Sequence, residues 1–109
     1  MTAPADRPED PTVAIGTFVY DGLVLCDVKI ALSPVRWGSG DDEDPPELAG
    51  DLVRPTYYLW WGSTTERGRF NAGGGGYASL ALAQAAAEAA PGIGPTVRWL
   101  WVADAASVR

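Results

Sequence analysis

The chain has 109 residues, of which 47% are hydrophobic, and its 14 acidic and 8 basic residues give a net charge of −6. This length suits one globular domain, the acidic balance disfavours a nucleic-acid ligand, and no apolar run reaches the ~18 residues that span a membrane. The chain has no histidine and one cysteine. It therefore lacks the usual general base and metal ligand and cannot form an intrachain disulfide, which disfavours an enzyme and predicts a cytoplasmic protein without a metal or cofactor.

Residues 1–11 carry three prolines and three acids, which predicts a flexible tail rather than a signal peptide. Residues 12–32 are typical of a β-hairpin around an Asp21-Gly22 turn. A two-residue turn pairs Val19 with Val24, Thr17 with Cys26, Ile15 with Val28, and Val13 with Ile30. These residues form one apolar core face with a buried thiol. The opposite face holds Phe18, Tyr20, Leu23 and Leu25 near the turn, and a homodimer or the following loop is expected to cover it.

Residues 33–55 are expected to form a long acidic loop, because prolines and glycines interrupt any regular element. Six of the 14 acids and none of the bases lie between Gly38 and Asp51. Four are consecutive: Asp41, Asp42, Glu43 and Asp44. Neighbouring acids do not converge easily on one ion, and the alternating acids of a calcium loop are absent, so a metal site is disfavoured. The segment is either a solvated connection or an epitope for a basic partner.

Residues 56–62 predict an aromatic strand with Tyr58 and Trp60 on one face and Trp61 on the other. One of these two tryptophans needs a cover other than the helix: a loop, a partner or a ligand. Ser63–Gly68 predicts a hairpin loop, and a returning strand starts at Arg69. The glycine tetrad 73–76 is interpreted as a tight corner, since a phosphate-binding glycine motif is not complete.

An alanine-rich helix is expected over about residues 77–90, ending at Pro91-Gly92, with Leu82 on its inner side. The last strand, 96–103, places Trp99 and Trp101 on one face beneath the helix. The order β-β-β-β-α-β predicts a single α+β domain over residues 12–109: a mostly antiparallel five-stranded sheet with one helix packed on one face.

Four short motifs in residues 56–84 resemble a family of small bacterial proteins of unknown function: Tyr57-Tyr58, Arg69-Phe70, Gly75-Gly76 and Ala81-Leu82. That family has an acid where this chain has Tyr77 and a glutamine where it has Leu80. The resemblance implies the same α+β architecture and brings no activity. One lysine among eight bases, with the alanine-rich helix, also indicates a GC-rich bacterial genome.

Two functions follow as hypotheses. The first is a non-enzymatic acidic protein that binds a protein partner, as an immunity protein or pathway accessory does, through Asp41, Asp42, Glu43 and Asp44 and an aromatic face with Tyr58, Trp60 or Trp61. The second is a small-molecule binding or tailoring protein of a biosynthetic pathway, with a pocket lined by Tyr58, Trp60 or Trp61 and Phe18. A homodimer through the aromatic face is a third reading.

Overall fold

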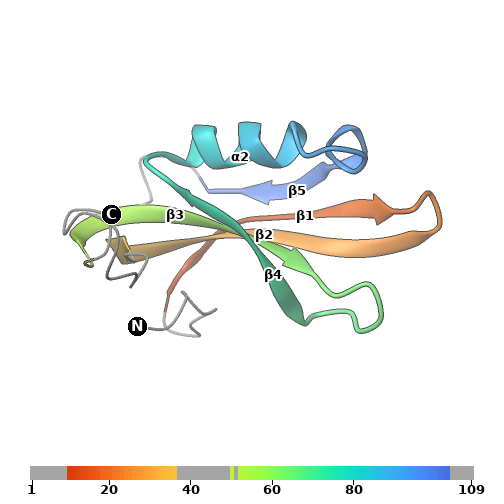
Figure 1. Ribbon diagram of the computed structural model, residues 1–109, viewed down its shortest axis with the longest axis horizontal. Coiled ribbons are helices and arrows are strands. Elements are labelled where there is room, and N and C mark those ends of the chain that lie inside the picture. Colours follow the sequence, from red (N-terminus) through yellow and green to blue (C-terminus); the bar gives the residue numbers. More distant parts are fainter. Residues whose placement is uncertain (1–9, 37–49, 51, 104–109) are drawn as a thin grey trace.

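The computed structural model describes residues 10–36, 50 and 52–103. They form, in order, β1 (Thr12–Tyr20), β2 (Val24–Arg36), β3 (Leu52–Gly62), β4 (Phe70–Tyr77), α2 (Leu80–Glu88), the 3-10 helix η1 (Gly94–Thr96) and β5 (Arg98–Val102) (Figure 1). No helix in this part of the chain is long and apolar enough to cross a membrane.

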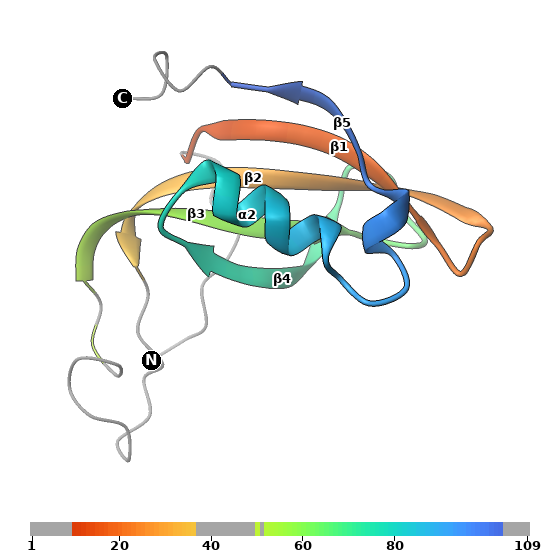
Figure 2. The same cartoon turned by 90° about the horizontal axis from the view of Figure 1, so that it is seen from above.

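The strands form one antiparallel sheet in the order β4-β3-β2-β1-β5. Helix α2 lies on one face of it, across the middle of the sheet and over β2 and β3 (Figure 2). The connection through α2 carries the chain from one edge of the sheet to the other, so the last strand pairs with the first. The predicted α+β architecture, a five-stranded antiparallel sheet with one helix, is confirmed.

The first hairpin differs from the prediction by one residue of register. Asp21 and Gly22 have φ of 54° and 67° and form the turn, but the pairs are Tyr20 with Val24 and Phe18 with Cys26. The predicted pairs are therefore wrong: Val19–Val24, Thr17–Cys26, Ile15–Val28 and Val13–Ile30. Alternate side chains point to opposite faces, so a one-residue shift exchanges the faces of β1 relative to β2. Phe18 thus lies in the core at 2% exposure, whereas Ile15 is 42% exposed on the helix-free face.

The main core lies between α2 and the sheet. Ala83 and Ala87 are fully buried among side chains of β1, β2 and β3. Small alanine side chains leave space for large rings, and Phe18 and Trp61 fill it edge to face, with ring centroids 5.0 Å apart. Helix α2 begins later than predicted because Ser79 caps it, its Oγ accepting from the Leu82 amide at 3.1 Å.

The strands β2 and β3 extend further than the predicted 33–55 loop allowed, since β2 ends at Arg36 and β3 begins at Leu52. Ser33 pairs with Thr56 and Val35 with Val53. Two residues of β3, Arg54 and Pro55, therefore oppose Pro34 in a β-bulge. A bulge interrupts the hydrogen-bond ladder, which is where a sheet tolerates proline.

The glycine tetrad lies within β4. The sequence had indicated a tight corner there, and that interpretation is wrong. Gly76 pairs with Tyr58 and Gly73 with Trp60, and a Cβ at these positions would lie 2.7 Å and 3.5 Å from the respective rings. The two glycines between them oppose Leu59 alone and form a bulge, in which Gly75 has a φ of 97°. The tetrad therefore gives room to the aromatic side chains of β3.

Two further expectations are corrected at the end of the chain. Trp99 pairs with Gly16 and Trp101 with Ile15, so Leu100 is an extra residue and the two tryptophans lie on opposite faces rather than one. Trp99 packs against the helix-side core and its Nε1 donates to a Glu88 carboxylate oxygen at 2.8 Å. Leu82, expected on the inner side of the helix, is 55% exposed.

Candidate functional site

The three aromatic residues predicted to bind a partner, Tyr58, Trp60 and Trp61, pack against other parts of the chain. Tyr58 and Trp60 lie on the helix-free face at 8% and 9% exposure, in a second small core with Phe70. Trp61 lies on the opposite face, as the alternation predicts, and packs against the main core. Neither Trp60 nor Trp61 is therefore largely exposed, and neither needs a partner or a ligand to cover it.

The other predicted site residues are placed differently. The acids Asp41, Asp42, Glu43 and Asp44 lie outside the described residues. Phe18 lies on the helix side of the sheet, whereas Tyr58 and Trp60 lie on the helix-free side. The lining predicted for a small-molecule site, Tyr58 and Phe18 with Trp60 or Trp61, is therefore wrong, because Tyr58 and Phe18 face opposite sides of the sheet. Of the two tryptophans, only Trp61 lies on the same side as Phe18.

A different set of side chains is exposed on the helix-free face. Trp101 of β5 lies beside Ile15 of β1, and Val19 of β1 lies beside Leu25 of β2. Trp101, Ile15 and Leu25 are 51%, 42% and 50% exposed, and Val19 is half-buried. We call these four residues the apolar row. Sequence reasoning missed it, because the predicted register buried Ile15 and Val19 in the core.

An ion pair lies beside the apolar row. Asp27, which pairs with Thr17 in the sheet, accepts from Arg67 Nε at 2.9 Å, from Arg67 Nη2 at 2.7 Å and from the Gly68 amide at 3.1 Å. The Arg67 hydrogen bonds, with help from that amide and against partial burial, hold the pKa of Asp27 below its usual range. The partners are 40 residues apart, so only the register of three strands reveals this pair.

The groups that elsewhere do chemistry hold structural positions here. Cys26 is fully buried, and burial raises the pKa of its thiol, so it stays protonated and unreactive at neutral pH. The Ser63 hydroxyl, 5% exposed, accepts from the amides of Thr65 and Glu66, both at 3.1 Å, and closes the predicted hairpin loop. Within the described ranges, no three acidic or cysteine side chains gather where they could hold a metal ion.

A wide, open cavity lies between two turns. It has a volume of about 460 Å³ and is lined by the hairpin tip and by the turn after α2: Tyr20, Asp21, Gly22, Pro91, Gly92 and Ile93. Its size falls within the range of small-molecule sites, about 300–1,000 Å³. Its lining holds one carboxylate and one phenol, Asp21 and Tyr20, which is little for fixing a ligand's orientation.

Comparisons with known proteins add no relative: no family model matches the sequence, and no curated protein or solved structure is significantly similar to it.

Proposed function

We propose that this chain is a non-enzymatic binding protein that docks a protein partner on the apolar row. The observation that carries the proposal is the exposure of Trp101, Ile15 and Leu25 together on the sheet face that has no helix. Contacts between proteins are enriched in aromatic and large apolar side chains at their centre, surrounded by polar groups. Trp101 is the expected centre, since tryptophan contributes more than most residues to such contacts.

The polar neighbours support this assignment. Asp27 and Arg67 lie next to the apolar row and form an ion pair with two hydrogen bonds. When a protein docks beside them and excludes water, each charge therefore keeps a partner of opposite sign. The buried thiol of Cys26 and the engaged hydroxyl of Ser63 favour binding over catalysis. The proposal also keeps the expectation of a cytoplasmic protein.

The acidic segment belongs to the same proposal through its charge alone. Asp41, Asp42, Glu43 and Asp44 belong to the six acids between Gly38 and Asp51 that account for the whole net charge of −6, and they would attract a basic partner over a distance that salt shortens. Replacing all four by Asn or Gln should slow association at low salt and leave it unchanged at high salt. Equal association rates at low salt would assign the segment to solubility.

The test of the docking surface uses two variants of the apolar row and a matched control. Leu25→Ser and Trp101→Ser remove exposed apolar groups from the row, and Leu82→Ser removes a similarly exposed one, 55% exposed, from α2. A partner isolated with the wild-type chain should bind Leu82→Ser equally and bind the two row variants at least about tenfold more weakly. Equal binding by all four proteins would refute the proposal.

Light scattering separates a foreign partner from a second copy. If the wild-type chain and Leu82→Ser are dimers and the row variants are monomers, then the occupant is another copy of this chain, as the aromatic-face homodimer hypothesis has it. If all are monomers, then the row is free for a different protein.

Small-molecule binding remains the alternative, and the cavity between the two turns is the observation that favours it. A ligand there would contact Tyr20, so its binding should quench or shift tyrosine fluorescence and be lost in Tyr20→Ala but not in Leu25→Ser.

A further inference from the structure

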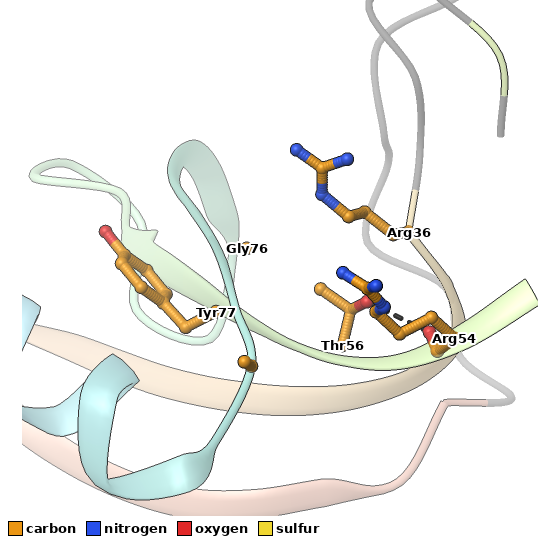
Figure 3. A pocket seen from close by; sticks show the side chains of 6 residues that line it. Arg36, Arg54, Thr56, Gly76 and Tyr77 are labelled. Carbon is orange, nitrogen blue, oxygen red and sulfur yellow. Dashed lines mark hydrogen bonds between the residues drawn. The ribbon is translucent and has the colours of Figure 1, made fainter. Parts of the chain in front are cut away.

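Two arginines reach one small cavity at the end of the sheet opposite the first hairpin. Arg36 is the last residue of β2, and Arg54 lies in the bulge at the start of β3. They line a cavity of about 100 Å³ with Thr56 and with the chain from Gly76 to Ala78. Figure 3 shows both guanidinium groups extending from the two strands toward Gly76 and Tyr77 of β4.

The bulge explains why both arginines meet there. Arg36 pairs past the bulge, at the position opposite Leu52, and Arg54 is one of the two residues that oppose Pro34. Bulges change the direction of side chains relative to a regular strand. The Thr56 hydroxyl donates to the Arg54 carbonyl at 3.0 Å, and Thr56 is 2% exposed, so the backbone that carries Arg54 is held in place.

The two arginines of this cavity differ in their partners from the arginines of the hairpin loop. Arg67 is bound by Asp27 and Arg69 by Glu66, but neither Arg36 nor Arg54 has a carboxylate partner among the residues that the structure describes. Two positive groups that face one cavity repel each other, and an anion between them removes that repulsion. Helix α2 begins at Leu80, two residues after Ala78 of the cavity lining. The positive end of its helix dipole therefore lies near the cavity and adds to the positive charge of the arginines.

We propose that Arg36 and Arg54 form a binding site for a phosphate-sized oxyanion. Guanidinium groups bind phosphate through paired, charge-assisted hydrogen bonds, and their planar geometry suits a tetrahedral oxyanion. The cavity, at about 100 Å³, is smaller than the sites of drug-sized ligands, about 300–1,000 Å³. It therefore takes the anionic group, either as inorganic phosphate or as the phosphate of a larger molecule whose remainder stays in solvent.

The site is separate from the apolar row, with which it shares no residue, so the two proposals fail independently. The positive charge of this site is also opposite in sign to the net charge of the whole chain. A net charge of −6 repels anions in general, and saturable phosphate binding would therefore report a local site rather than the overall field.

The experiment measures phosphate binding by calorimetry and by two-dimensional NMR at constant ionic strength. The variants Arg36→Gln and Arg54→Gln are compared with Arg69→Gln, which removes the same charge from a side chain that is 70% exposed in the distant hairpin loop. Wild type and Arg69→Gln should bind phosphate alike, and each cavity variant should bind it at least about tenfold more weakly. Phosphate should also raise the unfolding midpoint of wild type and not that of the double cavity variant.

Three outcomes would overturn the proposal: no saturable binding by wild type, equal weakening in all three variants, or acetate binding as tightly as phosphate. A comparison of inorganic phosphate with glycerol phosphate distinguishes the two sources of the anion. Tighter binding of the monoester, lost in the cavity variants, supports a site for a phosphorylated small molecule, and equal binding supports a site for the free ion.

Discussion

Replacing Gly74 by alanine should destabilise the fold, whereas the same replacement at the adjacent Gly73 should not. A Cβ at Gly74 would lie 2.7 Å from Leu59 Cδ2 and 2.8 Å from Trp61 Nε1, but a Cβ at Gly73 would lie 3.5 Å from the nearest atom, in the ring of Trp60. The usual contact between carbon atoms is about 3.5–4.0 Å. The new methyl at Gly74 is thus about 0.8 Å too close to a carbon atom of Leu59.

The magnitude follows from how little Leu59 can move. Leu59 is 2% exposed and packs in the main core, so the extra methyl causes overpacking, which typically costs about 1–3 kcal/mol. Replacing a strand glycine recovers about 0.5–1 kcal/mol through the reduced entropy of the unfolded chain. We therefore expect Gly74→Ala to lose up to about 2.5 kcal/mol and Gly73→Ala to gain up to about 1 kcal/mol.

Urea unfolding followed by tryptophan fluorescence measures both variants, and the five tryptophans give a strong signal. A difference of 1 kcal/mol also corresponds to about 4–8 °C in melting temperature for a domain of this size. Equal free energies of unfolding for the two variants would refute the assignment of the tetrad to β4, where side chains of β3 pack closely over the glycines.

Three further predictions test the described contacts. Asp27→Asn should be less stable than wild type at neutral pH. Because the folded-state pKa of Asp27 is lowered, the difference in stability should disappear as the pH falls below about 4. A difference that persists at lower pH would contradict the ion-pair assignment. Cys26 should react with iodoacetamide far more slowly in the native protein than in urea, because its thiol is buried with a raised pKa, and equal rates would show that it is accessible. Gly22→Ala should cost about 1 kcal/mol in unfolding free energy, because Gly22 has a φ of 67° and a Cβ there would contact nothing within 4 Å; a neutral effect would argue against the Asp21-Gly22 turn.

The tertiary structure decided which side chains form the candidate sites. One residue of register moved Phe18 into the core and Ile15 out of it, and the bulge at Leu100 separated Trp99 from Trp101. Turn propensity alone does not distinguish a two-residue from a three-residue hairpin loop around Asp21-Gly22. That choice depends on the summed packing of both faces against α2 and the neighbouring strands.

The arginine cavity shows the same dependence on long-range contacts. Arg54 directly precedes Pro55 and Arg36 lies two residues after Pro34. Both arginines belong to a stretch that the sequence assigned to an irregular loop, and no spacing rule connects them. They meet because β2 and β3 continue past Pro34 and Pro55 through a bulge, which hydrogen bonds between strands support and local propensity disfavours.

The sequence by itself determined the features that depend on neighbours along the chain. The Asp21-Gly22 turn, the single alanine-rich helix between residues 76 and 92, the aromatic strand with Trp60 and Trp61 on opposite faces, and the α+β order of elements all follow from local conformational preference and side-chain periodicity. Register, bulges, the pairing of Asp27 with Arg67 and the shared cavity of Arg36 and Arg54 were decided only by the tertiary structure. These features depend on how segments about 20–40 residues apart pair with each other. Several pairings have similar local energies, and the packing of the whole sheet determines which of them forms.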